Sequence, residues 1–532
     1  MRVKPRRSAP RLSRPCLDNH EHAGVSETDV RRRSPKRPPD LPKSAPPRPR
    51  RAVLATAVAA GVVLVVAIGL FVTSRWRVRD LSAQLPAPPP VSAQQKAVEQ
   101  HLRERYETAM RAPSLIAAVG PLCLAYHADM LFDAAERCYE VAGALAPGEW
   151  RWTYYRAVIQ SERGGGEALV ANLREVVERA PQFGPAWLRL GEAEFKAGRY
   201  DRAADAWRKA RDLPVESDAS VSPRHVTETP LSAYALLGLA RVALVRGEFD
   251  AARQTLEQLL STTPQFGSAL RLLAESYRKL GREAEAERFV YRAGRVPPYS
   301  PYADPVIDEL ARESRNSILL LRLASEANLA INAEWSEYLT RRALEFDPNN
   351  PEVVLKLARV LRTVERNEEA LALFERYQAM VPGDYQALAH IGSCLSAMGR
   401  FGEAETYFRQ ALKGLDDPVT HFNMGLLLAL TNRLDGAVGE YEKALELDPM
   451  HSDARTNLAA ALARQGKLDR AAHELTVLLE HDPENAGART NLGLVLLQQG
   501  HPAAARGQLE EALRLDPGLT PAREALDSIP NQ

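Results

Sequence analysis

The sequence predicts an all-α fold, an array of helical hairpins that runs from about residue 116 to residue 519. Three features of residues 351–519 predict it. A unit of about 34 residues recurs there with little interruption. Each unit has small residues at two fixed positions with a glycine or asparagine between them, and a proline closes most units.

The small residues mark the places where two helices of a unit cross. Antiparallel helices approach closely only where both present small side chains. In the first half of each unit these residues are Ala358, Gly392, Gly425, Ala459 and Gly493. In the second half they are Ala370, Ala404, Ala437, Ala471 and Ala505.

The residues between the two helices predict a tight turn. Gly399, Asn432, Gly466 and Gly500 tolerate a left-handed backbone at the end of a helix. Prolines that end the second helix follow at Pro382, Pro449, Pro483 and Pro517. Apolar residues such as Leu388, Ile391 and Leu395 recur at helical spacing, so each hairpin has one apolar side. Because one hairpin cannot bury that side alone, the hairpins must stack.

The spacing of small, aromatic and proline residues resembles the tetratricopeptide repeat. The segment NLGLVLLQQGHPAAARGQLEEALRLDP, residues 491–517, follows that pattern closely. The resemblance implies a solenoid of helical hairpins that binds other proteins and has no fixed chemistry of its own.

The first 51 residues differ in composition from the rest. They contain 15 Lys and Arg against five Asp and Glu, whereas the whole chain has a formal net charge of +1. With many prolines and no apolar period, they are expected to be a disordered tail. Setting membrane orientation is a sufficient role for this tail, and binding of anionic lipid head groups or of nucleic acid stays open as an alternative.

Residues 52–72, AVLATAVAAGVVLVVAIGLFV, contain no charged residue. As a helix they would rise about 31 Å, the thickness of the hydrocarbon core of a bilayer. A buried core helix or a cleaved signal peptide fits less well, because the preceding basic region is long and no A-x-A site follows directly. We predict a single transmembrane helix with a cytoplasmic tail and the array outside the cytoplasm, in the periplasm beyond a bacterial inner membrane.

The remaining chain divides by composition and by repeat register. The expected segments are a linker and lead-in helix at 73–115, repeats at 116–300 with a loop at 214–230, an interrupting segment at 301–316, regular repeats at 317–519, about eleven in all, and a C-terminal cap at 520–532. Two tyrosines, Tyr299 and Tyr302, lie near the start of the interrupting segment. They either contact a binding partner or belong to a loop that only connects the repeats.

Four cysteines are too few to build a disulfide-based domain. Cys16 lies in the tail, and Cys123, Cys138 and Cys394 lie in predicted helices, where we expect them to act as small buried packing residues. A disulfide between Cys123 and Cys138 across one hairpin is the alternative, and it requires an oxidising compartment.

No catalytic or metal-binding motif occurs in the sequence. It contains no H-E-x-x-H, no G-x-S-x-G and no paired C-x-x-C, and its histidines are scattered. We therefore expect no enzyme activity, no cofactor and no metal site.

The predicted binding site lies on the first helices, which line the inner face in the resembled family. Asn423, Asn457 and Asn491 occupy one position in three consecutive units, where His390, Lys356 and Arg322 precede them. A side-chain amide can pair with both polar groups of a peptide backbone. The row is similar to the asparagine ladder of O-linked N-acetylglucosamine transferases. Apolar contacts are expected from Phe422, Leu426, Leu430, Leu494 and Leu497.

A second predicted set is basic. Arg271, Arg278, Lys279, Arg359 and Arg362 could receive acidic side chains or a terminal carboxylate. A solvated polar face is the alternative reading of these residues.

Together these patterns predict a membrane-anchored scaffold that binds proteins or extended peptides outside the cytoplasm. Two alternatives stay open. One is a structural subunit of a cell-envelope complex that uses its outer face or the loops at 214–230 and 296–305. The other is a non-catalytic accessory to a transferase.

Overall fold

The computed structural model describes residues 83–90, 96–214, 229–296, 302–327 and 329–530. The chain divides into two units, Met1–Phe71 and Val72–Gln532, and every described helix belongs to the second. The predicted basic tail and the predicted transmembrane helix at 52–72 lie outside the described residues. Among the helices that are described, none combines the length and the apolar character needed to cross a membrane.

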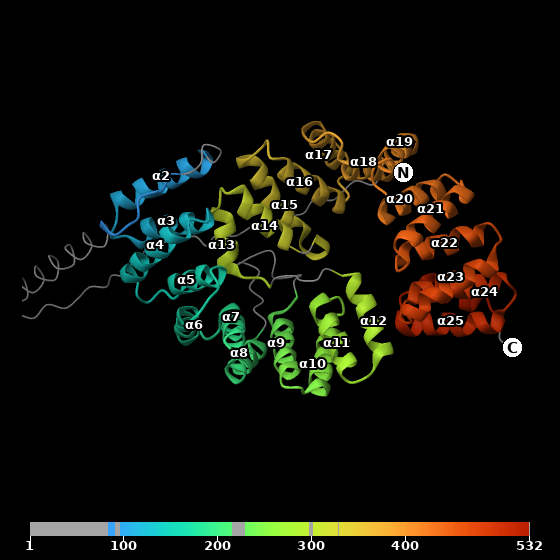
Figure 1. Ribbon diagram of the computed structural model, residues 1–532, viewed down its shortest axis with the longest axis horizontal. Coiled ribbons are helices and arrows are strands. Elements are labelled where there is room, and N and C mark those ends of the chain that lie inside the picture. The colour runs from blue at the N-terminus through green and yellow to red at the C-terminus, as the bar shows by residue number, and fades with distance from the viewer. Residues whose placement is uncertain (1–82, 91–95, 215–228, 297–301, 328, 531–532) are drawn as a thin grey trace, which may run out of the picture. The chain divides into compact units, whose positions relative to one another are not determined.

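The described residues form helices, α2 to α26, and no strand occurs among them. Most of these helices pair with a neighbour in sequence to form eleven hairpins (Figure 1). The first five are α3–α4 (Ile116–Ala128, Phe132–Leu145), α5–α6 (Arg151–Glu162, Glu167–Arg179), α7–α8 (Gly184–Lys196, Tyr200–Asp212), α9–α10 (Leu231–Val245, Phe249–Thr262) and α11–α12 (Gly267–Lys279, Glu283–Gly294).

The other six hairpins follow a short single helix, α13 (Pro305–Glu313). They are α14–α15 (Ser317–Glu326, Leu329–Phe346), α16–α17 (Pro351–Thr363, Asn367–Met380), α18–α19 (Tyr385–Ala397, Phe401–Ala411), α20–α21 (Pro418–Leu430, Leu434–Leu447), α22–α23 (Ser452–Arg464, Leu468–His481) and α24–α25 (Ala486–Gln498, Pro502–Leu515). Outside the hairpins lie α2 (Lys96–Arg111) at the start and α26 (Thr520–Asp527) at the end.

The turns and the helix crossings have the predicted chemistry. The four turn residues predicted in the regular part have positive φ angles, for example 76° at Gly399 and 60° at Asn432. At the crossings a side chain of the second helix covers the small residue of the first. A Cβ atom added to Gly392 would lie 2.9 Å from the Phe408 ring, and one added to Gly425 would lie 2.7 Å from the Tyr441 ring. Nothing larger than glycine fits at these two positions without a shift.

The apolar core is built between hairpins as well as within them. Phe374, Phe408 and Tyr441 occupy equivalent places in three successive hairpins, each at most 1% exposed, and all belong to one continuous cluster. This is the stacking that the apolar side of each hairpin predicted. The array ends where α26 packs Ala522 and Ala525 against α25, with Ile529 just beyond it.

The cysteines of the first hairpin depart from the expectation of plain packing. Cys123 on α3 and Cys138 on α4 form a disulfide, with their Cα atoms 5.1 Å apart. The packing interpretation was wrong because both residues face each other where the two helices cross, so their side chains meet. Cys394 is a buried free thiol, as expected, and burial raises the pKa of this thiol to about 11.

Candidate functional site

The first helices of the last hairpins carry one row of side chains at a fixed place. Each member lies two residues before the small crossing residue of its helix. From α16 to α24 the members are Lys356, His390, Asn423, Asn457 and Asn491, and we call them the first-helix row. All five are half-buried, so each side chain keeps part of its surface open to a ligand.

The three asparagines lie where the sequence predicted and differ in their partners. Asn423 Nδ2 donates to Ser393 Oγ of the preceding first helix at 3.5 Å, which shows that neighbouring first helices bring these positions together. Asn457 Nδ2 donates to the carbonyl oxygen of Asp453 within its own helix at 2.8 Å. The Asn491 side chain makes no hydrogen bond within the described part of the chain.

The predicted apolar contacts separate into two groups. Leu426 and Leu430, one helical turn apart on α20, are 36% and 60% exposed, as a ligand contact requires. Phe422 instead packs between Tyr441 and His451, with ring centroids 6.0 and 5.1 Å away. Leu494 and Leu497 pack against the cluster that α25 and α26 form.

At the α16 end the surface is basic. Burial and then the nearby Arg359 lower the pKa of Lys356. Burial, together with the positive charges of Arg362 and Arg359, lowers the pKa of His390 to about 4, while Asp384 and Asp417 oppose this shift. We call Lys356, Arg359, Arg362 and His390 the basic cluster.

The positive charges of this cluster lack acidic partners. Within the described residues, no carboxylate forms an ion pair with Lys356, Arg359 or Arg362. The Arg362 Nε atom is buried without a hydrogen-bond partner. Elsewhere in the array arginines are commonly paired, as Arg433 is with both oxygens of Glu405 at 2.9 Å. The basic cluster therefore offers charge to a group from outside the described chain.

The other predicted basic residues do not join this cluster. Arg271 on α11 donates to the carbonyl oxygen of Ala293 at 3.2 Å, and Arg278 pairs with Glu283 at 3.3 Å. Lys279 is exposed at the end of α11. No interaction connects these three residues with Arg359 or Arg362 in the described residues, so the structure divides the predicted basic set in two.

Two residues of the basic cluster were missed as site residues. Lys356 and His390 occupy the same position as the asparagines, and the repeat register alone places them in the row. For Lys356, its positive charge was the signal that could have identified it. His390, whose pKa is lowered to about 4, is neutral near pH 7, so only the repeat register indicates it. Among the described residues, no group of His, Cys, Asp and Glu side chains could hold a metal ion.

Comparison with protein families identifies the repeats. Residues 170–214, 228–300, 355–420 and 456–520 match a family model described as tetratricopeptide repeat, and residues 425–466 match a second described as TPR repeat. Together the two models cover slightly more than half of the chain.

Two curated relatives match part of the chain. One is small glutamine-rich tetratricopeptide repeat-containing protein 2 of Mycosarcoma maydis, 26% identical over 120 residues, or 23% of this chain and 34% of that protein. The other is cellulose synthase operon protein C of Xanthomonas axonopodis pv. citri (strain 306), 31% identical over 178 residues, or 31% of this chain and 10% of that protein. The match thus spans well under two thirds of either relative.

Three solved structures are similar to parts of this chain at low TM-scores. The Cut9–Hcn1 hetero-tetramer structure has a TM-score of 0.38 and 14% identity, covering 82% of this chain and 94% of that chain. YrrB, described as a TPR protein with an unusual peptide-binding site, has a TM-score of 0.31 and 23% identity over 35% of this chain and 97% of that one. PilW, described as a type IV pilus biogenesis factor, has a TM-score of 0.37 and 19% identity, covering 40% of this chain and 98% of that chain.

Proposed function

This chain belongs to the tetratricopeptide repeat family, and we propose that it is a non-catalytic scaffold that binds extended acidic segments of other proteins along α16, α18 and α20. The observation that carries the proposal is the basic cluster, whose charges have no carboxylate partner in the described chain. A ligand that brings carboxylates would supply those partners.

The neighbouring residues define the rest of such a ligand. Asn423 on α20 lies beside Ser393, which lies one turn beyond His390 on α18. The amide of Asn423 is therefore the next polar group after the basic cluster. Leu426 and Leu430 then offer exposed apolar surface. A segment with acidic residues at one end and apolar residues at the other matches this order. Its backbone between them would pair with the Asn423 amide.

The amide, charged and apolar contacts contribute different free energies to binding. A neutral hydrogen bond contributes about 0.5–1.5 kcal/mol and one to a charged group about 1.5–3 kcal/mol. Millimolar binding already requires about 4 kcal/mol after the cost of ordering the ligand. The amide alone therefore falls short of useful affinity. The basic cluster must supply a large share, with the leucines adding apolar burial.

The test is a selection of random displayed peptides on the purified full chain. We expect enriched sequences to combine Asp or Glu with apolar residues, and the Lys356→Ala, Arg359→Ala double variant to bind them more than tenfold more weakly. The Arg278→Ala, Lys279→Ala variant removes the same charge from α11 and should bind normally. Equal loss in both variants, or no enrichment of acidic peptides, would refute the proposed site.

We also propose that residues 52–72 anchor the chain in a membrane and that the array lies outside the cytoplasm. The uncharged stretch and the basic residues before it support an anchor. The disulfide between Cys123 and Cys138 supports an oxidising compartment.

Protease accessibility tests this location. Protease added to intact spheroplasts should degrade the array and leave residues 1–51 protected. Protection of the array with cleavage of the tail would reverse the proposed orientation, and recovery of the whole chain in the soluble fraction would remove the anchor.

A further inference from the structure

The helix α13 belongs to no hairpin, and most of its side-chain partners come from the start of the array. Arg342 on α15 also donates to the carbonyl oxygens of Ala311 and Ser314, each at 2.8 Å. The helix lies between the fifth and sixth hairpins in sequence, yet it contacts α3 (Figure 1). The partners of its carboxylates lie on α2, α5 and α7, more than 100 residues away in the chain. Because these partners are distant in sequence, tertiary contacts must hold α13 at this place.

The beginning of α13 is held by a buried carboxylate. Asp304 caps the helix, since its Oδ1 accepts from the backbone N–H of Val306 at 3.2 Å. Its Oδ2 accepts from the Tyr154 hydroxyl at 2.6 Å and from Arg189 Nη2 at 3.1 Å. Arg189 Nε also donates to the Tyr154 hydroxyl at 2.8 Å. With Asp304 only 3% exposed, these bonds are shielded from water.

The middle of α13 combines one more carboxylate with apolar burial. Glu309 Oε2 accepts from the Tyr155 hydroxyl at 2.7 Å. Val306 and Leu310, one turn apart, belong to the apolar cluster of the first hairpins. A nine-residue helix is too short to be stable alone, so the surface beneath it maintains its helical form.

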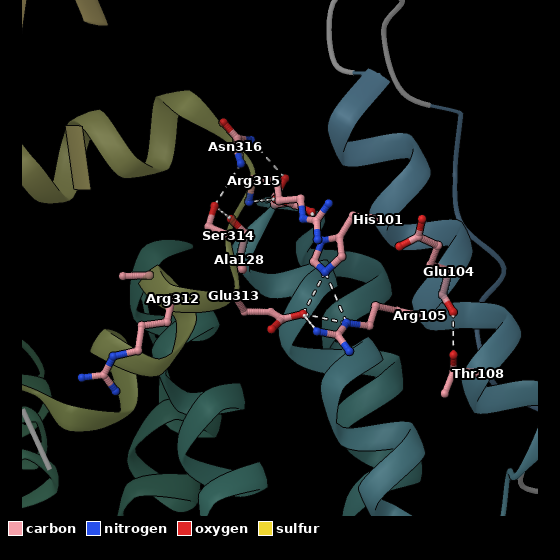
Figure 2. Close-up of polar contacts among 12 residues, drawn as sticks. His101, Glu104, Arg105, Thr108, Ala128, Arg312, Glu313, Ser314, Arg315 and Asn316 are labelled. Carbon is pink, nitrogen blue, oxygen red and sulfur yellow. Dashed lines mark hydrogen bonds and ion pairs between the residues drawn. The ribbon is translucent and has the colours of Figure 1, made fainter. Parts of the chain in front are cut away.

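The end of α13 meets α2 through a third carboxylate, shown in Figure 2. Glu313 Oε1 lies 2.8 Å from His101 Nε2 and accepts from Arg105 Nε at 2.8 Å. Just beyond the helix, Ser314 Oγ donates to the carbonyl oxygen of Ala128 at 2.9 Å. Acidic groups of α13 thus face cations or hydroxyls at its start, middle and end.

The repeat register connects this contact with the first-helix row. Tyr155 and Arg189 each lie two residues before the small crossing residue of their helices, Ala157 and Gly191. They therefore occupy the position that Lys356 and the asparagines occupy in later hairpins. In α5 and α7 this position already binds carboxylates, and those carboxylates belong to α13.

The fit of α13 leaves space beside it. A cavity of about 260 Å³ is lined by residues of the first three hairpins, α13 and α14, among them Glu162, Arg189, Leu310 and Arg322. A second cavity of about 390 Å³ continues from Arg189 and Tyr302 along α7 and α9. The surface that α13 covers is therefore part of a longer one.

We propose that the first-helix surface of α3, α5 and α7 is a second binding site of this protein, which takes acidic helical segments, and that α13 is its built-in ligand. The same site binds a partner protein when α13 dissociates from it. That partner carries a short helix with an N-terminal Asp-Pro and with carboxylates spaced like Asp304, Glu309 and Glu313. This site is distinct from the surface of α16, α18 and α20.

A peptide added in trans tests the proposal. The probe is a labelled synthetic peptide of residues 302–316, and the control peptide carries Asp304→Asn, Glu309→Gln and Glu313→Gln. The receptor is the full chain with the same three substitutions, which weaken its own α13 contacts. We expect the probe to bind this variant at least tenfold more tightly than it binds the unsubstituted chain, and the control peptide to bind neither.

A receptor-side change sharpens the result. Arg105 is 39% exposed, so Arg105→Ala in the triple variant should weaken probe binding several-fold without disturbing the core. Failure of the probe to bind a triple variant that keeps its helical circular dichroism would overturn the proposal.

Hydrogen exchange on the unsubstituted chain decides the matter if the triple variant does not fold. A bound ligand opens independently of its site, so α13 amides should exchange faster than those of α3, α5 and α14. Exchange of α13 in step with those helices would overturn the proposal, because α13 would then be an integral structural brace.

Discussion

Arg189 and Lys356 occupy the same position of the repeat, two residues before a small crossing residue, yet their surroundings differ. Arg189 binds the buried carboxylate of Asp304 at 3.1 Å. Lys356 is half-buried beside Arg359 and has no carboxylate partner within the described residues. One position of the repeat therefore carries a cation in both regions, and within the described residues only the cation near the start of the array has a carboxylate partner.

The largest expected difference between the two regions follows from removing these cations. Arg189→Ala leaves the Asp304 carboxylate buried without its cation, which costs about 3–5 kcal/mol of local stability. Lys356→Ala removes an unpaired charge and should change stability by no more than about 0.5 kcal/mol. Hydrogen exchange of α7 and α16 amides measures both. Similar effects in the two variants would contradict the contrast.

The disulfide gives the first hairpin a stabilisation that the later hairpins lack. It closes a loop with a sequence separation of 15 residues, so reduction should destabilise α3 and α4 by about 3 kcal/mol. The helix α18, whose Cys394 is a free thiol, is the internal control and should not respond. Faster exchange in α18 on reduction, or none in α3 and α4, would count against this account.

Lowering the pH should change the stability of the two regions in opposite directions, because the pKa of His390 is lowered and that of His101 is raised. Burial and two arginines lower the pKa of His390 to about 4, so the folded state binds fewer protons than the unfolded state. Stability of the α18–α19 hairpin therefore falls as the pH falls from 6.5 towards 4, by at most about 1.4 kcal/mol per pH unit. His390→Gln should remove this dependence. An unchanged pH profile in that variant would exclude His390 as its source.

His101 provides the matched case in the first region. Burial opposes protonation there, but the carboxylates of Asp129, 3.7 Å from Nδ1, and of Glu313, 2.8 Å from Nε2, outweigh it and raise the pKa of His101. Its contribution to stability is then present below pH 6.5 and is lost as the pH rises through the raised value. In His101→Gln, the contacts of α2 with Glu313 should lose their preference for acid, as read by exchange of α2 amides.

The smallest expected effect concerns the asparagines. Asn423→Ala should weaken binding of a selected acidic peptide by about 0.5–1.5 kcal/mol, roughly two- to tenfold, without changing stability. Asn457→Ala and Asn491→Ala, on α22 and α24 beyond the proposed site, should leave the affinity unchanged. Gln410→Ala removes an exposed amide from a second helix, α19, and serves as the control. Equal affinity in all four variants would remove Asn423 from the site.

The regular hairpins were predictable because their determinants are local. Small residues at the crossings and Gly399 or Asn432 at the turns act over a few residues and repeat in register. Even so, two turns with positive φ use Met130 and Glu365, which no composition rule indicates. Family models and structure agree on the repeat, while residues 1–82 lie outside what the structure describes.

The site was predictable only in part, because its chemistry depends on distant neighbours. The register placed the asparagines on the first helices α20, α22 and α24, and their role in binding stays a prediction. Phe422 instead faces Tyr441 and His451, and a helical pattern cannot tell which neighbouring hairpin a side chain meets. Leu494 and Leu497 are covered because the last hairpin packs against α26. The docking of α13 joins residues more than 100 positions apart, and nothing in its local sequence indicates the partner.

The central claim is that an external acidic segment binds where the row has no internal partner. The most direct measurement is a hydrogen-exchange footprint of the full chain with a selected acidic peptide bound. We predict added protection in the first helices α16, α18 and α20, and none in α17, α19 and α21. Protection confined to those second helices, or to residues 116–212, would contradict the claim.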